Sequence, residues 1–400
     1  MRFIYLLLKL LVKPALHLYH RSITITGKEH LRKKGPCILV SNHPATLLDP
    51  LNAAAIVPRQ VHFLANAGLF ASPFGKWFFS TFYCIPVQRR EDTGGKPLNN
   101  EQSFAAARHF LAQGGCLFIA PESTSLPTRH LRKIKTGLAR IGLAAEAEHD
   151  FQLGLFVLPI GLNYDNTRKF RPRLLANIGE PIPFAPFQKM YEQDPRSAVR
   201  AFTDSLQQHM SKLLLNTKNE EEDKLIPFLQ KKLKREKQLD PYELFLHTRA
   251  EVEKWHNWQQ NEPEKWIAFR QKLVQQEQEK KTNLTKLFKL KKIAFLLLGS
   301  IPALYGFLNN ALPVITTCKL SDKLKPDPSY EPTFKFISAL LAFPLFYTLQ
   351  TLAFAKYLSP AFPLANLNFP LWPLYLISLI PSGIFYERYR EWILRIDGVR

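Results

Sequence analysis

Cysteine is scarce, with four residues in a chain of 400. Cys37, Cys84, Cys116 and Cys318 are scattered, and no two of them stand at the spacing of metal ligands. No other group of ligand-type residues has that spacing either, so we expect no metal. We expect the four thiols to be buried and reduced.

Several motifs of other enzyme classes are also missing. The 17 glycines form no nucleotide-binding loop, so we expect no nucleotide cofactor. Ser125 invites comparison with a serine hydrolase, but no Gly-x-Ser-x-Gly elbow surrounds it. A covalent acyl-serine intermediate is therefore not expected.

Acidic residues are few relative to basic ones, 33 against 54, which gives a net charge of +21. Such a charge suggests an anionic partner: nucleic acid, the anionic leaflet of a membrane, or a phosphorylated substrate. No helix-turn-helix, zinc-finger or RNA-binding signature accompanies it. We therefore expect membrane lipids as the partner, and no nucleic acid.

Long uncharged stretches support the prediction that the protein is associated with a membrane. Residues 293–317 and 336–355 contain no charged side chain, and each is long enough to cross about 30 Å of hydrocarbon as a helix. Residues 357–386 are also uncharged, but five prolines interrupt them. A kinked span, a re-entrant segment and an interfacial segment all stay open for that third stretch.

The flanks of the apolar region predict its orientation. Basic residues precede the first stretch in residues 280–292 and follow the last in residues 387–400, so both ends are expected in the cytoplasm. Lysines at 319, 323 and 325, between the first two stretches, argue the other way. We predict an integral membrane protein whose catalytic domain faces the cytoplasm, and the sequence leaves its oligomeric state open.

The N-terminus predicts an amphipathic helix. In residues 1–20, basic side chains recur at helical spacing on one side and leucine fills the other, as in helices that lie in a membrane interface. A signal peptide is the alternative, but Lys9 and Lys13 interrupt the apolar run and no small-residue cleavage site follows.

His43 and Asp49 are the candidate chemical pair. They follow the apolar run 37–40, where a buried strand opens into a loop. A carboxylate beside histidine fixes its tautomer and stabilises the imidazolium, which makes a base near neutral pH. Asp49 could instead cap a helix with Pro50 at its first position, and His43 could be structural. The pair requires a non-helical loop, because six residues on a helix separate side chains by about 120°.

The pattern of short apolar runs and helical segments predicts an α/β domain with a central sheet flanked by helices. Helices are expected at 101–113, 138–148 and 198–216. The run 218–224 is typical of a linker or exposed turn. Residues 225–292 are typical of charged helices. We assign the three tryptophans of this region to helix packing rather than to a membrane anchor. The strand candidates are 37–41, 61–64, 84–87, 116–120 and 155–162.

These signals divide the chain into five regions. We expect an interfacial helix in residues 1–24, a catalytic domain in 25–216 and a charged helical region in 217–292. A transmembrane region in 293–386 and a basic cytoplasmic tail in 387–400 would follow.

Four blocks in order resemble the glycerolipid acyltransferases of the glycerol-phosphate and lysophosphatidate type. They are residues 42–49 (NHPATLLD), 85–90 (IPVQRR), 117–125 (LFIAPESTS) and 157–161 (VLPIG). The resemblance covers roughly residues 25–185 and implies acyl transfer from a thioester to a hydroxyl of a lipid precursor. Five residues separate the histidine from the aspartate instead of the common four, a variant similar to fungal and some bacterial glycerol-phosphate acyltransferases. Tyr83 and Ser123 stand where the family has glycine.

The resemblance also implies roles for individual residues. His43 and Asp49 would be catalytic, and Arg89 would contact phosphate through its forked donors, unless it is only a solvated surface arginine. Glu122 would shape the acceptor site or bond loop backbone, and Ser125 would lie in the same site. Lys135, before a helix N-terminus, could attract phosphate, although a solvated lysine is commoner.

The implied partners are an acyl thioester donor, acyl-CoA or acyl-carrier protein, and a phosphorylated glycerol acceptor. No cofactor is expected besides that co-substrate. Two alternatives stay open: a non-catalytic lipid-binding module on the same scaffold, and an acyltransferase for a non-phosphorylated acceptor that would not need Arg89.

Overall fold

The computed structural model describes residues 2–89, 99–167, 171–279, 286–323, 330–358 and 370–396. Two compact units make up the chain, Met1–Trp266 with Pro328–Thr333, and Ile267–Asp327 with Phe334–Arg400. Some predicted features fall outside the described residues, namely Arg90 of the second motif, lysines 280, 281 and 325, and residues 359–369 of the third apolar stretch.

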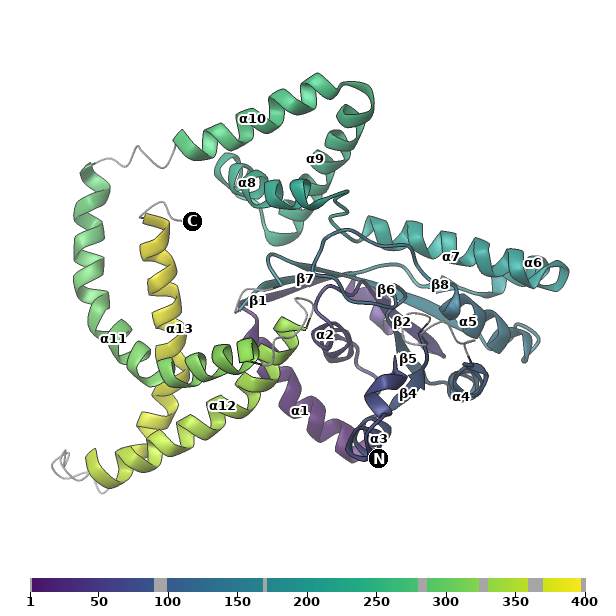
Figure 1. Cartoon of the computed structure of the whole chain (residues 1–400), viewed down its shortest axis with the longest axis horizontal. Coiled ribbons are helices and arrows are strands. Elements are labelled where there is room, and N and C mark those ends of the chain that lie inside the picture. Colours follow the sequence, from purple (N-terminus) through teal and green to yellow (C-terminus); the bar gives the residue numbers. More distant parts are fainter. Residues whose placement is uncertain are drawn as a thin grey trace. The chain divides into compact units, whose positions relative to one another are not determined.

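A mixed sheet forms the centre of the first unit (Figure 1). Its order is β1-β7-β6-β2-β5-β3-β4, with β8 beside β6, and all neighbours are parallel except β6 with β7 and β8. The strands of the described chain are β1 (Ser22–Thr26), β2 (Cys37–Ser41), β3 (His62–Asn66), β4 (Cys84–Val87), β5 (Cys116–Ile119), β6 (Phe156–Tyr164), β7 (Arg173–Ile178) and β8 (Ile182–Pro183).

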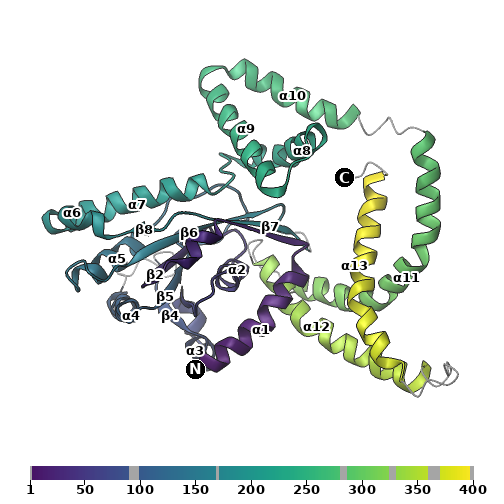
Figure 2. The same ribbon diagram turned by 180° about the vertical axis from the view of Figure 1, so that it is seen from behind.

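Helices cover both faces of this sheet. α4 (Glu101–Ala112), α5 (Gly137–Ala147) and α7 (Pro195–Lys212) share one apolar core with Ile38 and Val40 of β2. α2 (Leu48–Ile56) lies on the side opposite α7 and contacts α1 (Arg2–Tyr19), as both views show (Figures 1 and 2). The α3 helix (Pro73–Thr81) precedes β4, and α6 (Gln188–Gln193) precedes α7.

The expected fold class is confirmed. All five predicted strands are present with ends shifted by at most two residues, because short apolar runs between polar turns identify strands. β1, β7 and β8 were not predicted. β1 alternates Ser and Thr with Ile, and β8 has two residues, so neither carries a strong apolar signal.

The interpretation of 218–224 as a linker or exposed turn is only partly right, because Lys218 and Asn219 are exposed and precede the helix, whereas residues 220–224 are helical. Asn219 caps α8 (Glu220–Glu236) by accepting a hydrogen bond from Glu222 N, and the acidic first turn complements the helix dipole. Glu222 is fully buried and accepts hydrogen bonds from His256 at 3.0 Å and Gln259 at 2.8 Å. Glu220 and Glu221 are exposed at the start of this helix, whereas Glu222 is a core residue, a difference that the run of charges does not predict.

Two of the three tryptophans of the charged region pack as expected. Trp255 of α9 (Pro241–Asn261) is fully buried, and its ring centroid lies 5.3 Å from that of Trp266 in α10 (Pro263–Glu279). Aromatic contact between helices therefore accounts for this pair.

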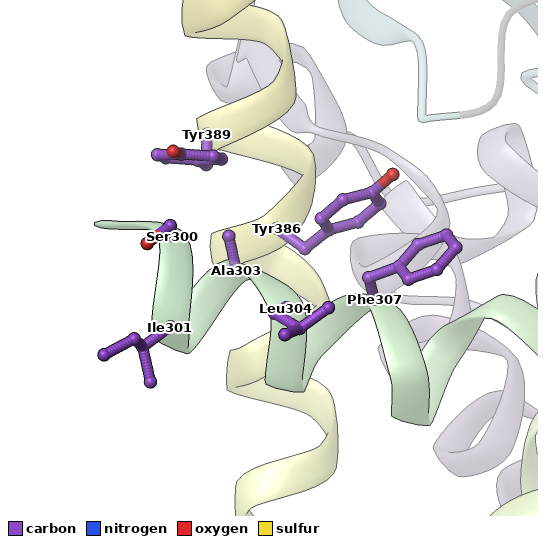
Figure 3. A pocket seen from close by; sticks show the side chains of 7 residues that line it. All are labelled: Ser300, Ile301, Ala303, Leu304, Phe307, Tyr386 and Tyr389. Carbon is purple, nitrogen blue, oxygen red and sulfur yellow. The ribbon is translucent and has the colours of Figure 1, made fainter. Parts of the chain in front are cut away.

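The second unit contains α11 (Lys286–Lys323), most of α12 (Glu331–Ala353), the π-helical turn Phe354–Leu358, and α13 (Trp372–Ile396). Gly306 lets α11 approach α13 closely, since a Cβ there would lie 2.2 Å from Ser382 O. Asn310 donates to Leu379 O at 3.2 Å and accepts from Tyr347 at 2.6 Å. Figure 3 shows the largely apolar side chains that line a depression along α11 and α13: Ser300, Ile301, Ala303, Leu304, Phe307, Tyr386 and Tyr389.

Two described segments are long and apolar enough to cross a membrane, Leu296–Lys323 and Glu331–Leu358. Only 28% and 22% of their most apolar windows are buried inside the structure, whereas the core helix of a soluble protein is mostly buried. Leu298 is 81% exposed and Ile301 78% exposed. These exposed apolar surfaces fit contact with lipid.

Candidate active site

The candidate site begins where β2 ends in the middle of the sheet. Asn42, directly after β2, donates to Leu162 O at 3.0 Å and accepts from Leu162 N at 2.8 Å. Its side-chain amide thus extends the pairing between β2 and β6 after the backbone of β2 turns away. These two hydrogen bonds fix the point from which the next residue, His43, leaves the sheet.

His43 and Asp49 lie in contact. His43 Nδ1 is 3.0 Å from Asp49 Oδ2, and the Asp49 side chain is fully buried while that of His43 is 18% exposed. Because an ionised carboxylate can only accept, Nδ1 carries the proton and Nε2 is left as the basic nitrogen. We refer to this pair as the His43–Asp49 dyad.

The capping role considered for Asp49 is not observed. Leu47 occupies the N-cap position of α2 without a side-chain bond, and Asp49 lies within the first turn. Its Oδ2 also accepts from Ala45 N at 2.7 Å, which closes the loop back on itself. The loop is non-helical, as the dyad requires, and Thr46 has a positive φ of 44°.

A buried chain of hydrogen bonds continues behind the dyad. Tyr164 of β6 donates to Asp49 Oδ1 at 2.8 Å, and Asn52 donates to Tyr164 Oη at 3.0 Å. His20 Nε2 lies 3.1 Å from Asn52 Oδ1. Burial raises the pKa of Tyr164, with the nearby Asp49 charge acting in the same direction. Burial lowers the pKa of His20 to about 4. Tyr164 therefore stays a neutral donor.

Glu122 connects the dyad loop to a second loop. Its Oε1 accepts from His43 N at 3.0 Å, and its Oε2 accepts from Arg132 N at 3.2 Å and Arg132 Nε at 3.0 Å. The loop-backbone role considered for Glu122 is therefore present, together with a largely buried ion pair. Sequence reasoning missed Arg132, because no motif marks it within a run of basic residues.

Both residues that replace family glycines keep a left-handed backbone. Ser123 and Tyr83 each have φ of 65°. The surrounding contacts hold this conformation although neither side chain favours it. Both turns therefore use a backbone conformation that glycine adopts most readily.

Two guanidinium groups converge on the turn 122–124. Arg89 Nη1 donates to Ser123 O at 3.0 Å, and Arg132 bonds both the hydroxyl and the carbonyl oxygen of Thr124. Glu122 offsets one of these two positive charges. The turn as a whole keeps a positive charge, which suits an anionic ligand.

The other two predicted site residues lie nearby in different roles. Ser125 Oγ accepts from Thr46 N at 3.0 Å, so it supports the dyad loop. Lys135 is exposed, and its backbone N donates to Pro121 O at 2.9 Å, two residues before α5 begins. Among the described residues, no group of three or more His, Cys, Asp or Glu side chains is arranged to hold a metal ion.

Comparison with known proteins identifies the domain around this site. Residues 22–163 match the family described as Acyltransferase. A stretch of 103 residues is 35% identical to glycerol-3-phosphate O-acyltransferase 2 of Saccharomyces cerevisiae, and 72 residues are 33% identical to glycerol-3-phosphate O-acyltransferase 1 of the same yeast. These matches cover 26% and 18% of this chain, but only 14% and 9% of the two relatives.

A solved structure gives a weaker likeness. The 1-acyl-sn-glycerophosphate (LPA) acyltransferase PlsC from Thermotoga maritima aligns with a TM-score of 0.38 and 17% identity, over 53% of this chain and 80% of that one. Residues 22–163 of this chain are therefore an acyltransferase domain, part of which is similar to glycerol-3-phosphate O-acyltransferases of yeast.

Proposed function

We propose that this chain transfers a fatty acyl group from a thioester to a hydroxyl of glycerol 3-phosphate. The observation that carries the proposal is the 3.0 Å contact between His43 Nδ1 and the buried Asp49, inside an acyltransferase domain. Both named yeast relatives are glycerol-3-phosphate O-acyltransferases, which favours this acceptor over lysophosphatidate.

The dyad would act as a general base. His43 Nε2 accepts the proton of the acceptor hydroxyl as its oxygen attacks the thioester carbonyl carbon. The new C–O bond forms, the C–S bond breaks, and the proton passes from His43 to the departing thiolate. Asp49 stabilises the imidazolium between these two steps, and no acyl-enzyme is formed.

The turn 122–124 would bind the acceptor phosphate. Arg89 already contacts this turn through Ser123 O, and its fork matches two phosphate oxygens. Lys135 is exposed nearby and adds positive charge. Glu122 would hold the dyad and the phosphate-binding turn at a fixed separation, because it bonds His43 N and Arg132 at once.

The reaction would take place at a membrane surface facing the cytoplasm. α1 exposes leucines on one side, Leu10 at 71% and Leu6 at 62%, while Leu16 on its other side is buried against the domain. This arrangement supports an interfacial helix, to which the two apolar segments of the second unit would add a spanning anchor. Acyl-CoA and acyl-carrier protein both supply the required thioester.

Purified full-length protein in lipid nanodiscs, labelled acyl-CoA and either glycerol 3-phosphate or lysophosphatidate would test the proposal. We expect lysophosphatidate as the product from glycerol 3-phosphate, and a rate roughly 10²- to 10⁴-fold lower in His43→Ala. His109→Ala, which changes an exposed histidine of α4, is the matched control.

The outcomes separate the alternatives. If only lysophosphatidate is acylated, the proposed acceptor is wrong but the proposed acyl transfer is correct. Transfer only to a neutral alcohol would exclude a phosphate role for Arg89. Absence of transfer from both acyl-CoA and acyl-carrier protein would leave a lipid-binding module instead of an enzyme.

A further inference from the structure

A distant hydroxyl completes the hydrogen bonding of the dyad loop. Three successive amides of this loop donate to side chains: Ala45 to Asp49, Thr46 to Ser125 and Leu47 to Thr333. The last bond is 3.1 Å long and joins residues 286 positions apart. Thr333 lies far outside the acyltransferase domain in sequence.

Thr333 Oγ1 uses its full bonding capacity on this loop. It donates to Ala45 O at 3.3 Å and accepts from Leu47 N, and it is also bonded to Thr46 Oγ1. A hydroxyl has one hydrogen and two lone pairs, so Thr46 is the donor in that last bond. Thr333 is 6% exposed, which leaves little water to replace these bonds.

The backbone around Thr333 is also held by the first unit. Residues 330–333 belong to that unit, and Pro332 O accepts from Tyr19 at 3.4 Å. Thr333 is the third residue of α12. The hydroxyl is thus supplied by the first turn of a helix that is otherwise largely apolar.

The loop needs such support because its conformation is unfavourable. Thr46, a β-branched residue, has a φ of 44° between His43 and Asp49. Loss of the Thr333 hydroxyl would leave Leu47 N–H and Ala45 O without these partners, and it would remove one of the bonds that hold Thr46 at positive φ. That change would move the backbone that joins the two dyad residues.

We propose that Thr333 is a positioning residue for the dyad, an inference that rests on the proposed function. Thr333 sets the separation of His43 and Asp49 without touching either side chain's reacting atoms. Activity would then depend on the first turn of α12 as well as on the acyltransferase domain.

Steady-state kinetics of full-length Thr333→Val in nanodiscs would test this. Valine keeps the shape of threonine, so we expect kcat to fall roughly tenfold or more while KM for each substrate changes less than twofold. Thr333→Ser should restore kcat to within about threefold of wild type. Thr203→Val is the matched control, because Thr203 is equally buried but bonds only its own helix at Val199 O. A Thr333→Val enzyme with wild-type kcat would overturn the proposal.

Hydrogen exchange separates this inference from the proposed function. We expect the peptide around Leu47 to exchange at least tenfold faster in Thr333→Val than in wild type, with no change in β2. Equal exchange in the two proteins would reject the positioning role even if the enzyme is active. If the wild-type protein transfers no acyl group, the proposed function is rejected. Hydrogen exchange then still tests whether Thr333 holds the loop. If Thr333→Val also loosens β2, the smaller Thr333→Ala takes its place under the same criteria.

Discussion

Tyr164 Oη donates a 2.8 Å hydrogen bond to Asp49 Oδ1, on the opposite side of the carboxylate from His43. The two oxygens of Asp49 are therefore committed to different partners. This bond orients the carboxylate plane and lowers its freedom to rotate away from the imidazole.

Tyr164→Phe should reduce kcat by roughly ten- to 150-fold, because a hydrogen bond to a charged group is worth about 1.5 to 3 kcal/mol. Initial rates at saturating substrate would measure the effect. Tyr5→Phe, which removes another buried hydroxyl that bonds Arg59 O and Val61 N, provides the control. Equal rates for Tyr164→Phe and wild type would show that Ala45 N and His43 alone orient Asp49.

Arg89→Lys should raise KM for glycerol 3-phosphate roughly five- to thirtyfold and change KM for the acyl donor little. Lysine keeps the charge but loses the fork that matches phosphate. The matched control is Arg108→Lys, which alters an arginine of α4 paired with Glu148 at 2.6 Å. An equal rise in both KM values would contradict a phosphate role.

His20 should make the fold sensitive to mild acid. Burial lowers the pKa of His20 from 6.5 to about 4. Between these two pH values His20 is therefore protonated in the unfolded chain but neutral in the folded chain. Stability is unaffected above pH 6.5 and falls as the pH drops toward 4, by a total on the order of 3 kcal/mol. Thermal unfolding of His20→Gln should therefore lose less stability than wild type over this range. Parallel pH curves for the two proteins would exclude His20 as the cause.

Alkaline carbonate should fail to extract the full-length protein from membranes. Helices that span the bilayer are held by burial of apolar surface, which neither high pH nor high salt removes. Fractionation after carbonate washing would measure this directly. Release into the supernatant would reject spanning by Leu296–Lys323 and Glu331–Leu358.

The sequence predicted the dyad because its signal is local. A buried strand followed by His43 and Asp49 locates both residues at the end of β2, and the structure has them in contact. Glu122 and Arg89 were found in the same way, each just beyond a short strand. Strand ends in a parallel sheet gather at one edge, so local motifs could be combined without knowledge of the full topology.

The supporting residues could not be predicted because they depend on tertiary contacts. Tyr164 ends a strand that neighbours β2, Arg132 lies in a loop without regular structure, and Thr333 is separated from the loop by most of the chain. No local sequence pattern around any of these three residues marks it as part of the site. The antiparallel β6–β7 pair was missed for the same reason, since pairing direction follows from topology and not from composition.

The left-handed turn at Ser123 offers a route to a more robust protein. Its hydroxyl has no hydrogen-bond partner among the described residues although it is buried, and its φ of 65° favours glycine. Replacing it with glycine would remove both penalties, each about 1 kcal/mol. The carbonyl that Arg89 contacts belongs to the backbone and would survive the change. Thermostability could therefore be engineered next to the dyad without altering any side chain assigned to the chemistry.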